Sequence, residues 1–418
     1  MFASFARRTR VATVGALAVV ALSLTACSGA GQAGNDSNSS TVSEGLAGSF
    51  ETAVQNALEK SGSTQAVVGV WTSEGEYVQG FGEGIDAGSQ FNAAQTATPF
   101  ACAILLEKVT AGELKLNQPV SDVLTRQAHL DDITFEQLCT QRSGLADYKK
   151  GFESANMQTP ERVFAEQELL ANTFARSPLS WPGLDFHESD GNALLLHRAL
   201  RIQAAVSPQN LYQDELFEVA EMRSSYIPET TETSLGEGGL TPLAYPTKDG
   251  NAVCDAEDIT LSGVSTTMIS GPGSAVTTVT DMKRFYDAYF AGTFGGPKQA
   301  SITTTTESAS NPERDKDGNP TGEVEEGGAE WGFGVEKVGP LLGHAGKLSG
   351  TISAAYQDPE TKFTVAVALN NSTAGASFAR ALAFELAAIA AENGAAPEMS
   401  WTAEAQANAI AEKAVCAS

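Results

Sequence analysis

The most specific local pattern in this chain is the segment ITFEQLCTQRSGL, residues 133–145. It predicts a helical run over residues 134–142, followed by the turn-forming pair Ser143-Gly144. The segment lies in a part of the chain where helical runs alternate with linkers rich in Gly, Pro and Asp. The other such runs are residues 100–111, 160–173, 193–204 and 280–290. The middle of the chain is therefore predicted to be helical.

Strand patterns flank this helical middle on both sides. On the N-terminal side a helix over 50–59 precedes two β-rich runs, 65–71 and 77–82, which are joined by the turn signal Ser73-Glu74-Gly75. On the C-terminal side the β-rich runs are 331–338, 350–358 and 363–369, and a closing helix is expected over 377–393.

Strands at both ends predict an α+β fold of the α/β-sandwich type. In this fold one antiparallel sheet is built from both chain ends, with flanking helices and an inserted all-helical lobe over about residues 93–300. The domain is expected over 49–395, with a C-terminal tail over 396–418. The cleft between sheet and lobe is the default place for a site.

Several landmarks occur in one order along this framework. They are residues 107–120, the opening segment 133–145, Pro182-Gly183 before an apolar helix, and Gly271-Pro272-Gly273 followed by residues 277–285. Together they resemble the serine β-lactamase and D-Ala-D-Ala carboxypeptidase superfamily, in its esterase-like branch. The resemblance covers roughly residues 50–393 and implies the β-lactamase/transpeptidase-like fold.

The resemblance also implies where catalytic residues would lie. In this family a serine opens a helix and a lysine follows three residues later, so that the amine takes the hydroxyl proton. Here Gln95 stands at the serine position and Thr98 at the lysine position. A carboxamide is not a nucleophile, and a threonine hydroxyl is not a base near neutral pH. No S-x-x-K pattern exists in the chain; the nearest, Thr280 to Lys283, is more simply a capped helix start.

Of the two later family motifs, one is degenerate and the other is retained. Where the family has Y-x-N, this chain has Glu188-Ser189-Asp190, and Glu188 is either an acid or base or a solvated, capping carboxylate. On the late strand His344-Ala345-Gly346 fits the family's H-x-G, whose glycine lets the strand edge pair with a substrate backbone. His344, Gly346 and Ser189 are therefore predicted to line the ligand cleft.

Three hypotheses follow for the function. The first is a non-catalytic family member that binds a peptide, a peptidoglycan fragment or an envelope protein. The second is a serine hydrolase, such as a carboxypeptidase, esterase or β-lactamase, that uses a displaced nucleophile such as Ser189. The third is a metal site formed by His187, Glu188, Asp190 and His344, whose residue types suit zinc or a harder cation. The first is favoured, and it requires neither a cofactor nor a metal.

The N-terminus has the pattern of a secretion signal. Arg7, Arg8 and Arg10 precede an apolar run over 11–24, which is too short to span a bilayer. Leu24-Thr-Ala-Cys27 resembles a bacterial lipobox, which implies removal of residues 1–26 and a lipid on Cys27; an ordinary cleavage site is the alternative. Residues 27–48 are predicted to be a flexible tether, because they are rich in Gly, Ser and Asn. The expected location is outside the cell membrane, anchored by lipid to its outer face.

Charge and cysteine content narrow the partners. The formal net charge is −25, from 51 acidic and 26 basic residues, and this excludes nucleic acid as an expected partner, since phosphate binding needs Lys and Arg. Four cysteines remain after Cys27, and an oxidising compartment permits two disulfides among them. The favoured pairs are Cys102 with Cys139 and Cys254 with Cys416, and four free thiols are the alternative.

Overall fold

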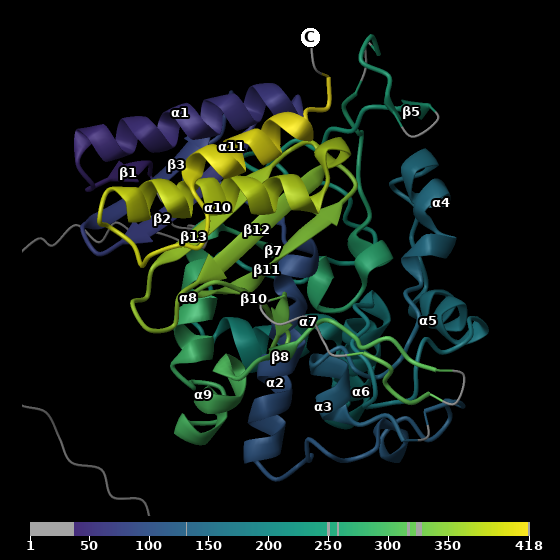
Figure 1. Ribbon diagram of the computed structural model, residues 1–418. Coiled ribbons are helices and arrows are strands. Elements are labelled where there is room, and N and C mark those ends of the chain that lie inside the picture. Colours follow the sequence, from purple (N-terminus) through teal and green to yellow (C-terminus); the bar gives the residue numbers. More distant parts are fainter. Residues whose placement is uncertain are drawn as a thin grey trace, which may run out of the picture. The chain divides into compact units, whose positions relative to one another are not determined.

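The computed structural model describes residues 37–130, 132–248, 251–256, 259–315, 318–322 and 328–416 (Figure 1). All of these residues belong to one compact unit, residues 34–418. The expected signal segment and the expected lipidation residue Cys27 lie outside the described residues. Within the described part of the chain, no helix combines the length and the apolar character needed to cross a membrane.

A large antiparallel sheet forms the centre of the domain. In sheet order its strands are β1 (Ser39–Ser40), β3 (Gly75–Phe81), β2 (Ala66–Thr72), β13 (Thr364–Leu369), β12 (Thr351–Gln357), β11 (Leu341–Leu348), β10 (Glu336–Val338), β9 (Glu330–Trp331) and β8 (Glu307–Ser308). N-terminal strand β2 pairs directly with C-terminal strand β13. The prediction of one sheet built from both chain ends is confirmed.

Two short two-stranded ribbons and a set of helices complete the fold. The ribbons are β4 (Phe91–Asn92) with β7 (Val276–Thr277), and β5 (Thr247–Lys248) with β6 (Asn251–Ala252). The helices are α1 (Glu44–Ser61), α2 (Thr98–Thr110), α3 (Phe135–Cys139), α4 (Glu153–Gln158), α5 (Glu166–Ala175), α6 (Asp190–Ala204), α7 (Pro208–Tyr212), α8 (Val279–Phe290), α9 (Pro297–Thr304), α10 (Ala376–Glu392) and α11 (Ala403–Glu412).

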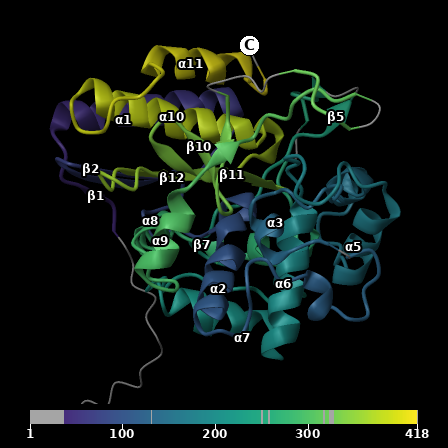
Figure 2. The same ribbon diagram turned by 60° about the horizontal axis from the view of Figure 1, so that its bottom comes forward.

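Helices cover both faces of the sheet, and the strand sequences explain why. Neighbouring residues of β2 point to opposite faces, so Val67 enters one apolar core and Val68 the other. One core lies under α1 and α10, with α11 packed on α10, and the other contains α2 and α8 with the helical lobe (Figures 1 and 2). A strand that is buried on both faces reads as a continuous apolar run.

Helix α2 occupies the middle of the helical lobe. Ten of its thirteen residues are buried, which is the pattern of a helix surrounded by other elements rather than one lying at the surface. It contacts α6, α3 and the start of the site described below. A disulfide joins Cys102 of α2 to Cys139 at the end of α3. It links the segment 133–145 to this central helix.

The second disulfide joins Cys254, after β6, to Cys416 near the C-terminus. These are the same two pairs that the sequence favoured. Residues 396–416, which the sequence assigned to a tail, contain α11, whose first turn is capped by Thr402 and which packs on α10. At the other end, β1 and the first turns of α1 lie within the segment assigned to the tether. Both segments therefore add secondary structure to the domain.

Two of the differences between predicted and observed elements have a local physical reason. The run 331–338 forms two strands separated by a turn, because Gly334 has a φ of +78° and a Cβ there would lie 2.9 Å from Pro99 Cα. The helix expected from residue 160 begins at Glu166, since tertiary contacts use the preceding backbone groups: the Phe164 N–H donates to Thr267 Oγ1. Sequence periodicity does not reveal such competing partners.

Candidate functional site

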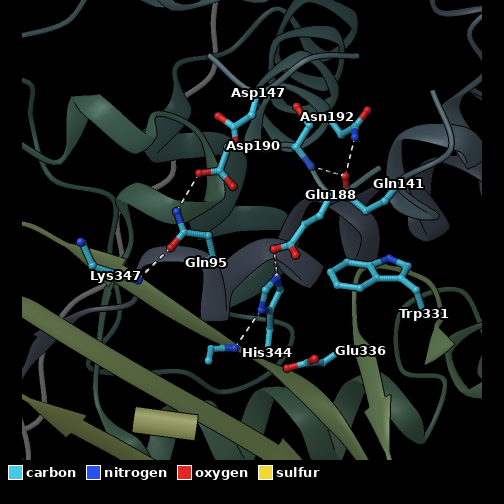
Figure 3. A network of polar contacts seen from close by, with 12 residues as sticks. Gln95, Gln141, Asp147, Glu188, Asp190, Asn192, Trp331, Glu336, His344 and Lys347 are labelled. Carbon is cyan, nitrogen blue, oxygen red and sulfur yellow. Dashed lines mark hydrogen bonds and ion pairs between the residues drawn. The ribbon is translucent and has the colours of Figure 1, made fainter. Parts of the chain in front are cut away.

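The site lies where the 3₁₀ turn Ala94–Ala97, which leads into α2, meets β11 and the start of α6 (Figure 3). These elements place the three degenerate or retained motifs side by side. Gly346 of β11 faces the turn so closely that a Cβ at this position would lie 2.4 Å from the Gln95 nitrogen and 2.9 Å from Ala94 Cβ. Only glycine fits this approach, which gives the glycine of the H-x-G motif a packing role.

Gln95 bridges the site from α6 to β11. Its Nε2 donates to Asp190 Oδ2 at 2.7 Å, and its Oε1 accepts the Lys347 backbone N–H at 2.8 Å (Figure 3). The side chain is buried, and both ends of its carboxamide have partners. The residue at the family's nucleophile position thus occupies the strand edge that a substrate backbone would need.

Thr98, at the family's lysine position, is also buried and supplies no amine. With Gln95, Tyr148, two residues of α6 and the segment 269–273, it lines a cavity of about 10 Å³. A cavity of that size holds at most about one water molecule. The space beside the degenerate pair therefore does not accommodate a peptide in this conformation.

Lys149 lies next to this pair, although no motif in the sequence points to it. Its Nζ is 2.9 Å from Asp190 Oδ2 and 3.8 Å from Asp147 Oδ2. Burial acts to lower the pKa of Lys149, but the charges of Asp190 and Asp147 and the hydrogen bond to Asp190 outweigh it, so that the pKa lies above its usual value. Lys149 therefore remains a cation near neutral pH and is not a general base there.

Asp147 completes this charged group. Burial, and then the neighbouring charge of Asp190, raise the pKa of Asp147, while Lys149 acts to lower it. Asp147 also accepts the backbone N–H of Lys149 at 2.7 Å. Lys149 contacts both carboxylates and so offsets their mutual repulsion, and it pairs with the same Asp190 oxygen that accepts the Gln95 Nε2 hydrogen bond.

Glu188 and His344 meet at the outer side of the site. His344 Nε2 is 3.5 Å from Glu188 Oε1, and the Glu188 side chain is 55% exposed. His344 Nδ1 accepts the Ala345 N–H at 2.8 Å, so a neutral ring carries its hydrogen on Nε2, toward Glu188. The Trp331 ring packs edge-on against His344, as Figure 3 shows. Glu188 is thus an exposed partner of His344 and does not cap α6.

The prediction that Ser189 lines the ligand cleft is corrected by its burial. The residue is fully buried, and its Oγ accepts the Gly191 N–H as the N-cap of α6. Its backbone N–H donates to Gln141 Oε1 at 3.0 Å, and Asn192 donates to the same oxygen. Ser143 donates to Asn192 in turn. The segment 133–145 therefore holds the start of α6 through Gln141 and Ser143.

A metal centre is not supported by the arrangement. Within the described ranges, no group of three or more His, Cys, Asp or Glu side chains lies close enough to hold a metal ion. Of the four suggested ligands, Glu188 and His344 form a pair, whereas Asp190 binds Gln95 and Lys149. The third hypothesis drawn from the sequence thus lacks its geometry.

Comparison with known proteins agrees with this arrangement of motifs. The family model described as Beta-lactamase matches residues 50–390, most of the chain. The chain belongs to the beta-lactamase family. The resemblance inferred from the sequence is confirmed, and with it the β-lactamase/transpeptidase-like fold.

Several solved structures share the fold of this chain. A D-stereospecific amidohydrolase from Streptomyces sp. matches with a TM-score of 0.66 and 19% identity over 80% of this chain and 97% of that one. A D-amino acid amidase from Ochrobactrum anthropi SV3 matches with 0.64 and 17% over 82% and 99%. An octameric penicillin-binding protein homologue from Pyrococcus abyssi matches with 0.66 and 18% over 84% and 78%. At these identities the likeness concerns the fold alone.

The close approach at Gly346 yields a prediction for this beta-lactamase family member. Gly346→Ala places a Cβ against the Gln95 backbone, so we expect a loss of about 1–3 kcal/mol in the free energy of unfolding, measured by urea denaturation. Gly48→Ala is the matched control, because a Cβ there meets nothing within 4 Å and alanine favours the helix. Equal stability of the Gly346→Ala variant and the wild type would contradict the packing role.

Proposed function

We propose that this chain is a non-catalytic member of the beta-lactamase family that is anchored at the cell envelope and acts by binding a protein partner. The observation that carries the proposal is the Gln95 carboxamide, which fills the nucleophile position and joins Asp190 to the β11 edge. A side chain held at both ends in this way acts as a structural bridge across the cleft.

The chemistry of the neighbouring groups supports the absence of hydrolysis. A carboxamide does not attack a carbonyl carbon, Thr98 is not a base, and Lys149 is held as a cation by two carboxylates. Removing the nucleophile from a serine hydrolase costs on the order of 10⁶ in rate. The chain has a serine β-lactamase-like hydrolase fold. Hydrolysis does not follow from that fold, because the groups at the site differ in the way just described.

The competing hypothesis of a displaced serine nucleophile has a weak candidate. Ser189 is fully buried, and its hydroxyl already accepts a hydrogen bond as a helix cap. Attack on a substrate would require the residue to leave this position and uncap α6. No described residue of the site acts as a base for the Ser189 hydroxyl. The neighbouring Gln141 accepts a hydrogen bond from the Ser189 backbone N–H and not from the hydroxyl.

The kind of ligand follows from the space beside Gln95. A peptide or peptidoglycan fragment that used the family's strand edge would have to displace the Gln95 carboxamide from both of its partners. The cavity of about 10 Å³ between Gln95, Thr98 and α6 is too small to receive either ligand in place of the carboxamide. A protein partner that contacts the outer surface requires no such opening, so we favour a protein over a stem peptide.

The envelope location rests on the N-terminal sequence. The basic start, the apolar run and the lipobox-like residues ending at Cys27 support export and lipid attachment. Two disulfides in the described domain fit an oxidising compartment. A lipid on Cys27 would tie the domain to the outer face of the membrane through a segment rich in Gly, Ser and Asn.

Covalent labelling tests the non-catalytic proposal. We expect a fluorescent penicillin and a fluorescent fluorophosphonate to leave the purified protein unlabelled, because no described residue at the site pairs a nucleophile with a base. Denaturing gels and intact mass spectrometry measure the label, and a penicillin-binding protein, which keeps its penicilloyl adduct, serves as the positive control for the penicillin. Stoichiometric labelling that Ser189→Ala abolishes would establish the displaced-serine alternative instead.

Substitution of the proposed lipid-bearing residue tests the anchoring. In a bacterial host that processes lipoproteins, Cys27→Ser is expected to move the protein from the membrane fraction to the soluble exported fraction, since it removes the acylated thiol. Fractionation and immunoblotting measure the change. Equal membrane association of the variant and the wild type would show that a lipid on Cys27 does not anchor the protein.

A further inference from the structure

A groove of about 490 Å³ runs between α1 and α10 on the face of the domain opposite the helical lobe. Figure 1 shows these two helices side by side on the outer face of the sheet. Five small residues and Asn56 of α1 line one side, and Glu385 and Ile389 of α10 line the other. The lining used below consists of Gly45, Gly48, Ser49, Thr52 and Asn56 from α1 and Glu385 from α10.

The α1 side is a stripe of small residues at helical spacing. Positions 45, 48, 49, 52 and 56 follow the three- and four-residue steps that place side chains on one helix face. The Ser49 and Thr52 hydroxyls donate back to the carbonyls of Gly45 and Gly48, at 3.0 and 2.8 Å. The stripe therefore presents a low, smooth surface along the helix.

The two glycines have no packing role within this domain. A Cβ at either Gly45 or Gly48 would meet nothing within 4 Å, and neither residue has a positive φ. Glycine inside a helix is less stable than alanine, because its backbone loses more freedom on folding. Because these two residues have no side chain, another backbone can approach α1 closely at these positions.

Glu385, on the α10 side, is a second and independent feature. The residue is 6% exposed, and among the described residues its Oε2 has no hydrogen-bond partner. Burial alone raises the pKa of this carboxyl to about 7, with no charged group contributing. Ionising a buried carboxylate without a partner costs free energy, and either protonation or a cationic partner relieves that cost.

We propose that the α1–α10 groove is a docking site for a helix of a partner protein, which places a lysine or arginine side chain against Glu385. This docking surface is separate from the degenerate cleft and goes beyond the function proposed above.

The form of the groove favours a helix as the occupant. The stripe from Gly45 to Asn56 spans eleven residue steps, or about 16 Å of helix axis at roughly 1.5 Å per residue. A straight surface of small residues of this length matches a second helix lying along it, and it lets the two backbones come close. A compact small molecule would use only part of the stripe.

Charge favours a basic partner rather than a second copy or a membrane. A cation that reaches Glu385 forms a charge-assisted hydrogen bond in a site with little water. A second copy would bring its own Glu385 to the same interface, and two chains of net charge −25 repel each other. An anionic lipid surface would likewise be repelled by the carboxylate.

The test uses stapled, alanine-rich helical peptides with a fluorophore and a single central lysine or glutamine. Fluorescence anisotropy measures their binding to the full chain without its signal segment. At pH 8 we expect the lysine peptide to bind at least tenfold more tightly than the glutamine peptide. Glu385→Gln should abolish that difference. The preference should also shrink below pH 7, because protonation of Glu385 removes its charge.

Two further variants separate docking in the groove from general attraction to an acidic protein. Gly48→Leu fills the stripe and should weaken binding of both peptides at least tenfold. Gln55→Leu, on an exposed α1 position that does not line the groove, should leave binding unchanged. Circular dichroism checks that each variant is folded.

Three outcomes would overturn the proposal: no binding of either peptide, equal binding of the lysine and glutamine peptides, or full binding by Gly48→Leu. Each is independent of the covalent labelling test, which reports only on the cleft. A protein that resists labelling and also fails to bind these peptides would keep the non-catalytic proposal and lose the docking site.

Discussion

The site depends on the contact between the turn before α2 and β11. Gly346 allows the two backbones to meet, and the Gln95 carboxamide then spans from Asp190 to the Lys347 N–H. Because the strand belongs to the central sheet and Asp190 begins α6, this single side chain links the sheet to the helical lobe. Under the function proposed above, this boundary is an interior contact and not a substrate cleft.

Polar groups around this contact hold it in one arrangement. Lys149 pairs with Asp190, while Gln141 and Ser143 bind the first residues of α6. In a low-dielectric interior such groups are favourable only when each has a partner, so the network favours one orientation of Gln95. The Asp190 carboxylate accepts a hydrogen bond from the Gln95 carboxamide and pairs with the Lys149 ammonium group. Both contacts favour an acidic residue at this position.

Much of the fold was predictable because alternating and helical patterns record burial. Strands β2, β3, β12 and β13 and the long helices α1, α2, α6, α8 and α10 were recognisable, whereas β11 was located only through the resemblance of residues 344–346 to H-x-G. The motif register placed Gln95, Asp190 and Gly346 in one site. Contacts that depend on three-dimensional distance were not predictable. Lys149 lies in a linker without periodicity, and Ser189 was misjudged because α6 was expected to begin later, although serine before aspartate is a common helix start. The Ala-rich run of α11 has a helical pattern, although residues 396–418 were predicted to be a tail.

The central claim is that Gln95 closes the cleft, and a crystal structure of the protein soaked with a peptidoglycan stem peptide ending in D-Ala-D-Ala tests it most directly. The account predicts electron density for the Gln95 carboxamide between Asp190 and the Lys347 N–H, with no peptide beside β11. A peptide paired with the β11 edge, with Gln95 turned away from both partners, would contradict it.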